Sequence, residues 1–101
     1  MVGLLRLVVS ALAGAGTPIA KVESILEQVA EEQTMIVDEP RPEILFLGLN
    51  NNRPKFDLRV YSPTIDSFNR LRNDLHEAIV KKFQEEELEL LNCSAEVSQD
   101  L

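Results

Sequence analysis

Residues 43–61 read EILFLGLNNNRPKFDLRVY and contain two apolar segments on either side of a turn. The first segment, residues 43–49, is apolar at nearly every position, which is typical of a strand buried on both faces or at an oligomer contact. In the second, residues 56–61, apolar and polar residues alternate, which predicts one dry and one wet face. Residues 50–54 between them have turn chemistry, because asparagine tolerates left-handed dihedral angles. The two segments therefore predict a β-hairpin.

A strand and a helix are predicted before this hairpin. In residues 4–12, apolar side chains recur on one face with period two: Leu5, Leu7, Val9 and Ala11. After a turn of small residues, Thr17 and Pro18 predict a helix start, with threonine as the N-cap and proline at the first helical position. Apolar residues then recur at helical spacing to about Glu32: Ile19, Val22, Ile25, Leu26 and Val29. Prolines in residues 38–42 cannot continue a helix, so they predict an irregular segment before the hairpin.

A second helix and a short strand are predicted after the hairpin. Thr64 or Asp66 is the expected N-cap, and the apolar stripe of the helix consists of Phe68, Leu71, Leu75, Ala78, Ile79 and Phe83. Acidic residues 85–87 oppose the helix dipole, so the helix is expected to fray before Glu87. Residues 88–91 are predicted as the last strand. The expected organisation is one domain over residues 1–91 and a polar tail over residues 92–101.

This order of elements, βαββαβ, predicts an α+β fold. Each helix links two parallel strands, and right-handed crossovers then give a ferredoxin-like plait with strand order 4-1-3-2. Both helices pack on one face of a four-stranded antiparallel sheet. The other face is left to solvent or to a partner.

Composition excludes some classes of partner. The net charge is −7, and the 10 basic residues are scattered through the sequence, so nucleic acid and anionic membrane surfaces would be repelled. Residues 1–20 resemble a signal peptide, with an early Arg6 and small residues 13–15, but cleavage there would remove the first strand. That apolar run is too short to span a membrane, so any contact with a membrane depends on segments absent from this sequence.

No catalytic, cofactor or metal site is predicted. The small-residue turn at 13–17 lies between a strand and a helix, where backbone N–H groups can hold a phosphate, but it lacks the P-loop and dinucleotide signatures. Single Cys93 and single His76 are too few ligands for zinc. The carboxylates at 38–39 and 85–87 are interpreted as solvated charge. Asp57 and Arg59, two residues apart, are expected to pair across the surface.

The hairpin carries a family resemblance. Residues 42–49 and 56–61 resemble the Pro-x-Val-Leu-Phe-x-Gly-Phe and Phe-x-Leu-Arg-Val strands of the small-conductance mechanosensitive channel family. Residues 86–90 are similar to the Glu-Gly-Ile-Glu-Ile of that family, and residues 21–26 are similar to its Lys-Val-x-x-Ile-Leu. The family's aromatic, glycine and aspartate before the first helix are missing here.

The resemblance implies a cytoplasmic C-terminal channel domain on the inner membrane of a bacterium. In the family such domains form the wall of a heptameric chamber with side openings, so the implied partners are other copies of the subunit. A non-catalytic role in assembly follows. The alternative is a ferredoxin-like module that senses small molecules, and an acylphosphatase-type enzyme is a third option that lacks its turn arginine.

Overall fold

The computed structural model describes residues 5–63 and 65–99, and these fold in the predicted order βαββαβ. The elements are β1 (Leu5–Ala13), α1 (Ile19–Glu32), β2 (Glu43–Asn50), β3 (Arg53–Ser62), α2 (Phe68–Glu85) and β4 (Leu90–Gln99). The first position of the predicted first strand, Leu4, and one of the two predicted caps, Thr64, lie outside the described residues.

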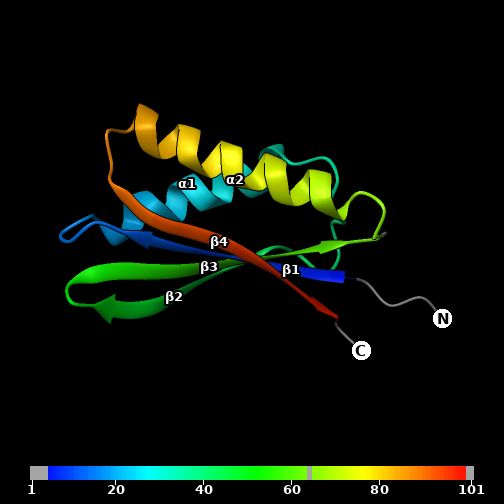
Figure 1. The fold of residues 1–101 in the computed structure, drawn as a ribbon, viewed down its shortest axis with the longest axis horizontal. Coiled ribbons are helices and arrows are strands. Elements are labelled where there is room, and N and C mark those ends of the chain that lie inside the picture. Colours follow the sequence, from blue (N-terminus) through cyan, green and yellow to red (C-terminus); the bar gives the residue numbers. More distant parts are fainter. Residues whose placement is uncertain (1–4, 64, 100–101) are drawn as a thin grey trace.

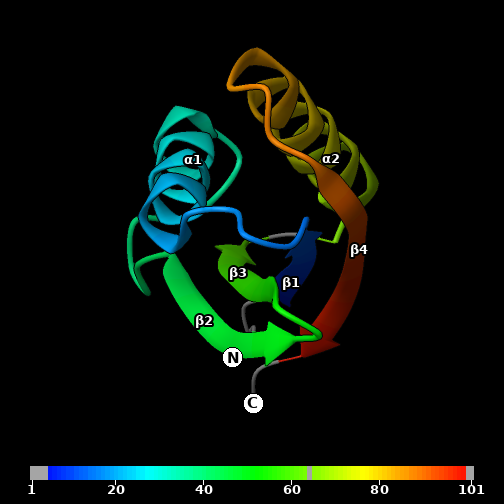
Figure 2. The same cartoon turned by 90° about the vertical axis from the view of Figure 1, so that its left-hand side faces the viewer.

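The four strands form one antiparallel sheet in the order β2-β3-β1-β4. This is the predicted order 4-1-3-2 read from the other edge, so the ferredoxin-like α+β plait is confirmed. Both helices lie on the same face of the sheet (Figure 1). Seen from one end, α1 lies over the β2 edge and α2 lies over the β4 edge (Figure 2).

The core fills the space between the sheet and the two helices. Alternate residues of the central strands point into it: Leu7, Val9, Ala11 and Ala13 from β1, and Phe56, Leu58 and Val60 from β3. The helices contribute the predicted stripes, of which Val22, Ile25, Leu26, Val29, Leu71, Leu75, Ile79 and Phe83 are buried. Each such side chain stabilises the fold by about 1.5–3 kcal/mol relative to an exposed one. The core is mainly aliphatic because the sequence supplies only four Phe and no Trp.

Neither predicted N-cap is found. Pro18 is the N-cap of α1, in extended geometry, and the Thr17 hydroxyl instead donates to the Gly14 carbonyl oxygen over 2.7 Å. The N-cap of α2 is Ser67, and no capping hydrogen bond from its side chain is found. Asp66 is therefore not the cap. At both helix starts, the residue at the N-cap position differs from the one that the sequence spacing predicts.

The C-terminus of α2 is closed by a turn that contains no glycine. The helix ends at Glu85, as expected, and Glu87 adopts a left-handed φ of 56°. The backbone N–H of Leu88 donates to the Phe83 carbonyl oxygen over 2.8 Å, and that of Glu87 donates to the Gln84 carbonyl oxygen over 3.1 Å. This is the Schellman arrangement, which satisfies the last carbonyls of a helix and brings the chain back toward the sheet.

The predictions of a final strand over residues 88–91 and of a polar tail from residue 92 are wrong. Strand β4 begins at Leu90 and continues to Gln99, paired with β1 along its length except for one irregularity opposite Leu12 and Ala13. Cys93, Ala95 and Val97 lie opposite Ala11, Val9 and Leu7, and so share the helix-covered face. The domain boundary predicted at residue 91 does not hold for residues 92–99.

The hairpin is confirmed, but one of its strands is not buried. Asn51 and Asn52 both have positive φ, 52° and 65°, as a two-residue hairpin turn of the primed type requires. Strand β2 is an edge strand and has no fully buried residue. Burial on both faces was wrong, because β3 occupies the inner position and β2 has a neighbour on one side only. In β3, Tyr61 is buried although the alternation predicts a wet position.

Candidate functional site

The most prominent unexplained surface lies along β2. Phe46, Leu47 and Leu49 are exposed to 40%, 48% and 58%. Edge strands usually carry charges or prolines that block pairing with other chains, but residues 44–52 carry no charge. A register shift between Phe46 and Gly48, where φ is 105°, bends the strand. Large apolar side chains at such an edge indicate a contact surface.

The same side of the domain is acidic near the start of β2 and the end of α1. A hollow of about 890 Å³ lies between the second half of α1, the loop of residues 33–42 and Ile44. Its charged lining consists of Glu27, Glu31, Asp38, Glu39 and Arg41. Asp38 and Glu39 are exposed, in keeping with their interpretation as solvated charge. We call the apolar β2 residues together with this acidic lining the β2 side.

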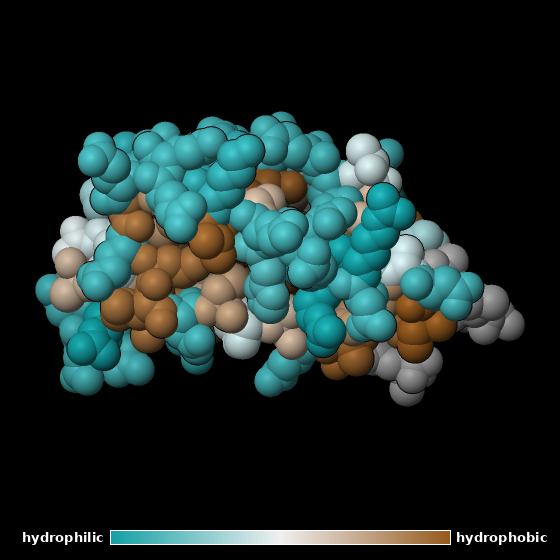
Figure 3. All heavy atoms as spheres, turned by 45° about the horizontal axis from the view of Figure 1, so that its top comes forward, coloured by the Kyte–Doolittle hydropathy of each residue, from teal (hydrophilic) through white to brown (hydrophobic). Residues whose placement is uncertain are grey.

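The opposite side of the domain carries a second set of exposed apolar residues. Val80 of α2 and Leu91 of β4 are exposed to 40% and 42%. Val80 lines a shallow hollow of about 260 Å³ with His76, Glu77, Lys81 and Gln84. The guanidinium of Arg72, one turn before His76, lies 5.6 Å from the ring centre of Phe68. We call Arg72, His76, Val80, Lys81 and Leu91 the α2 side. The largest group of apolar atoms on the face shown in Figure 3 lies left of centre, a smaller group lies at the lower right, and polar atoms cover much of the surface above them.

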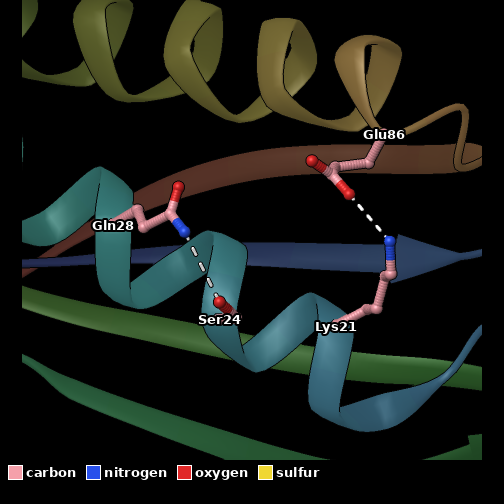
Figure 4. Close-up of polar contacts among 4 residues, drawn as sticks. All are labelled: Lys21, Ser24, Gln28 and Glu86. Atoms are coloured by element: carbon pink, nitrogen blue, oxygen red, sulfur yellow. Dashed lines mark hydrogen bonds and ion pairs between the residues drawn. The ribbon is translucent and has the colours of Figure 1, made fainter.

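Among the described residues, two ion pairs connect α1 with α2 and the residue that follows it. Lys21 Nζ of α1 lies 2.8 Å from Glu86 Oε1 just after α2, as Figure 4 shows, and Lys82 Nζ lies 3.5 Å from Glu32 Oε1. The hydrogen bond from Lys21 and its charge hold the pKa of Glu86 below its ordinary value. Lys21, Lys82, Glu85 and Glu86 line a groove of about 200 Å³ with Ser24, Ile25 and Gln28. Three of its four charged groups, Lys21, Lys82 and Glu86, form ion pairs within the chain.

Backbone N–H groups of the small-residue turn at 13–17 donate hydrogen bonds to carbonyl oxygens of this chain. The backbone N–H of Gly14 donates to Glu89 over 2.9 Å, that of Gly16 to Asn52 over 3.3 Å, and that of Thr17 to Gly14 over 3.1 Å, each to a carbonyl oxygen. A phosphate site at a helix start requires such N–H groups to be free. The geometry therefore gives no support to a phosphate role for this turn.

The remaining candidate residues, Cys93 and His76, do not form a catalytic or metal-binding site with other side chains among the described residues. Burial raises the pKa of the Cys93 thiol to about 11, which opposes a nucleophilic role. The buried Nε2 of His76 has no hydrogen-bond partner among the residues that the structure describes. Within residues 5–63 and 65–99, no group of three or more His, Cys, Asp and Glu side chains is placed to hold a metal ion. None of their helices is long and apolar enough to cross a membrane.

The expected pairing of Asp57 with Arg59 is wrong. Asp57 accepts a hydrogen bond from the Ser10 hydroxyl of β1 over 2.7 Å, and no ion pair joins it to Arg59 among the described residues. Arg59 lies directly opposite Glu43 in the β2–β3 register instead. Same-face neighbours in a strand are farther apart than cross-strand neighbours, which explains the difference.

Comparison with known proteins identifies the family of this chain's fold. The family model described as mechanosensitive ion channel MscS, C-terminal, matches residues 8–90. An uncharacterized MscS family protein of Haemophilus influenzae is 34% identical over 77 residues, which cover 69% of this chain. The chain spans only 7% of the length of that relative.

Solved structures share the fold at low sequence identity. A protein of Pseudomonas aeruginosa aligns with a TM-score of 0.62 at 15% identity, covering 98% of this chain and 95% of that one. A dimeric ferredoxin-like protein of Thermobifida fusca aligns with a TM-score of 0.60 at 13% identity, covering 97% and 92%. A dimeric ferredoxin-like protein of Bacteroides fragilis aligns with a TM-score of 0.56 at 12% identity, covering 97% of both chains.

Proposed function

This chain belongs to the MscS family of mechanosensitive ion channels, to which its match with the C-terminal domain assigns it, and on that premise we propose that it is a non-catalytic wall and assembly domain of such a channel. It stands on the cytoplasmic side of the inner membrane. Seven copies form a chamber beneath the pore, with openings through which ions pass. Tension sensing and the pore itself belong to other segments of the channel.

The apolar β2 side supports this role most directly. Phe46, Leu47 and Leu49 are 40%, 48% and 58% exposed and lie outside the hydrophobic core cluster. Large apolar side chains are enriched at the buried centres of subunit interfaces. The ferredoxin-like proteins of Thermobifida fusca and Bacteroides fragilis are dimeric, which supports self-association of this fold in general.

The chemistry of the remaining residues agrees with a passive role. The donors of the small-residue turn are used within the chain, the Cys93 thiol has a raised pKa, and the carboxylates of residues 38–39 are exposed. A sensor of small molecules needs free polar groups that converge on a pocket. Three of the four charged groups in the interhelical groove are engaged in ion pairs within the chain, so the groove does not favour the sensor alternative.

A chimera tests the proposal. Residues 5–99 replace the corresponding domain in a channel of the family, and light scattering of the solubilised protein measures the number of chains. We expect a single ring of seven chains. Leu47→Lys combined with Leu49→Lys should reduce the yield of rings, whereas lysines at exposed Ala20 and Ser24 of α1 should not. A chimera that assembles no better than the channel without the domain would refute the assembly role.

A further inference from the structure

We infer that the hollow beside the start of β2 binds a basic peptide segment of a partner, in which lysine or arginine residues flank one aliphatic side chain. The hollow lies between the second half of α1, the loop of residues 33–42 and Ile44. This inference goes beyond the proposed function, because ring formation does not require a ligand there. Three features of the described residues support it: a fixed wall, an apolar floor and an acidic rim.

Hydrogen bonds of the backbone fix one wall of the hollow. The loop of residues 33–42 is attached to the sheet, because the Val37 N–H donates to the Tyr61 carbonyl oxygen over 3.0 Å. The loop also begins in a closed turn, in which the Gln33 N–H donates to the Ala30 carbonyl oxygen over 3.2 Å. The opposite wall is α1, which lies over the β2 edge (Figure 2). A ligand can therefore bind without the cost of ordering a loop.

The floor of the hollow is apolar and adjoins the core. Ala30 is buried, and Val37 and Pro42 are half-buried. Ile36 and Ile44 also line the hollow, and both pack against the hydrophobic core cluster. The volume of about 890 Å³ lies within the range of ligand sites, which is about 300–1,000 Å³. The floor therefore offers an aliphatic side chain a place out of water.

The rim of the hollow is acidic. Glu27 and Glu31 lie one turn apart on α1, and both are exposed. Asp38 and Glu39 are exposed on the loop, and Arg41 is the single cation of the lining. Among the described residues, none of these four carboxylates belongs to an ion pair. Like charges one turn apart repel each other, so a cationic ligand relieves repulsion at this rim.

The combination of floor and rim selects the class of ligand. A metal ion does not suit the hollow, because no group of three or more His, Cys, Asp and Glu side chains among the described residues is placed to hold one. A second copy of this chain would bring a net charge of −7 to an acidic surface, which is unfavourable. A peptide segment with cationic side chains on both sides of an aliphatic one matches the rim and the floor together.

Two peptides test the proposal. Blocked Lys-Lys-Leu-Lys-Lys is added to the isotope-labelled chain and followed by amide NMR. Saturable shifts are expected at Glu27, Glu31, Ile36 and Ile44. Blocked Lys-Lys-Ser-Lys-Lys has the same charge but lacks the aliphatic side chain, so it should bind about five- to ten-fold more weakly, as expected when one partly buried leucine is missing. Equal affinity of the two peptides would indicate attraction to charge alone and would overturn the proposal.

Two double variants provide a matched control. Glu27→Lys with Glu31→Lys changes the rim, whereas Glu77→Lys with Glu96→Lys changes exposed positions on α2 and β4. Each double variant replaces two Glu by two Lys and so raises the net charge from −7 to −3. Surface substitutions of this kind leave the fold intact, and amide spectra verify this.

At physiological salt the rim variant should bind the leucine peptide about ten-fold more weakly, whereas the control should change its affinity less than about two-fold, because distant charges are screened. Equal weakening by both variants would overturn the proposal, as would the absence of saturable shifts at millimolar peptide. Concentration-dependent shifts of the same amides in the chain alone would identify a second copy as the occupant and overturn it too.

Discussion

Phe46 lies directly opposite Phe56 across the β2–β3 ladder, with the two ring centres 5.2 Å apart and the ring planes tilted by 42°. Phe56 is fully buried in the core, whereas Phe46 is among the exposed apolar residues of the edge strand. One aromatic pair thus connects the proposed contact surface to the centre of the domain. Tilted pairs of this kind stabilise a fold beyond the area that they bury.

Alanine substitutions at Phe56 and Phe46 should lower the free energy of unfolding by different amounts, because one ring is buried in the core and the other is partly exposed. Phe56→Ala removes a fully buried ring and should lower the free energy of unfolding by about 3–5 kcal/mol. Phe46→Ala should lower it by about 1–2 kcal/mol, because the ring contact and a part of the buried area are lost. Leu49→Ala, at the more exposed end of the strand, should change it by less than about 0.5 kcal/mol. Urea denaturation measures all three, and equal losses for Phe46→Ala and Phe56→Ala would contradict this packing.

Gly14 should tolerate no side chain. A Cβ at this buried position would meet the side chain of Glu89, including its Cβ at 2.9 Å, while the Gly14 N–H bonds the Glu89 carbonyl oxygen. Gly14→Ala should therefore destabilise the fold by about 1–3 kcal/mol. Combination with Glu89→Gly should recover part of the loss, because the obstructing side chain is then gone. Thermal unfolding of the two single variants and the double variant measures this coupling, and purely additive losses would disprove the contact.

The Lys21–Glu86 pair should contribute a small stabilisation that depends on pH. Pairing lowers the pKa of Glu86 in the folded state from its ordinary 4.5, so the contribution is present above that value and is lost as pH falls through the lowered pKa. Glu86→Gln should lower Tm slightly at neutral pH and low salt, and the difference should vanish in acid. Lys21→Met is the matched control, and the double variant should lose no more than either single one. A Tm difference that grows on acidification would contradict this sign.

The sequence was sufficient for the element order and the core because strong periodicity marks both. Leu7 and Val9 at period two, and Leu71 and Leu75 at helical spacing, are all buried. The sequence predicts too short a last strand because the inward side chains of Cys93 and Ala95 are small. Their alternation with Asn92, Ser94 and Glu96 is therefore weak in hydrophobicity. The alternation was nevertheless present and would have signalled a longer strand.

Other differences depend on tertiary context that periodicity does not contain. An apolar run such as residues 43–49 looks the same in a central strand and in an edge strand with a partner, and only the sheet order separates the two. Thr17 has the composition of an N-cap, but its hydroxyl donates within the preceding turn. The candidate contact surface was visible in sequence as an oligomer contact on β2. The α2 side was not, because Val80 follows the buried Ile79 and Leu91 follows Leu90 in short apolar runs that predict a helix stripe and a strand, and periodicity does not show which of their members remain exposed.

The isolated chain should be a monomer or a weak dimer. A stable interface buries about 1,200–2,000 Å² in total, which is a large share for one side of a domain of this size. A charge of −7 on each copy adds repulsion at low salt. Light scattering coupled to size exclusion at micromolar concentration should give a mass close to the 11.3 kDa of one chain, with a concentration-dependent rise. A stable heptamer would show that this domain alone carries the energy of assembly.

Patch-clamp recording of the chimera tests the central claim most directly, because it asks whether residues 5–99 serve as the cytoplasmic domain of a working mechanosensitive channel. In membrane patches from cells without other such channels, the account predicts tension-activated currents well above those of the channel lacking this domain. It also predicts that Leu47→Lys with Leu49→Lys reduces these currents while Ala20→Lys with Ser24→Lys preserves them. Currents from the chimera that equal those of the channel without the domain would contradict the account.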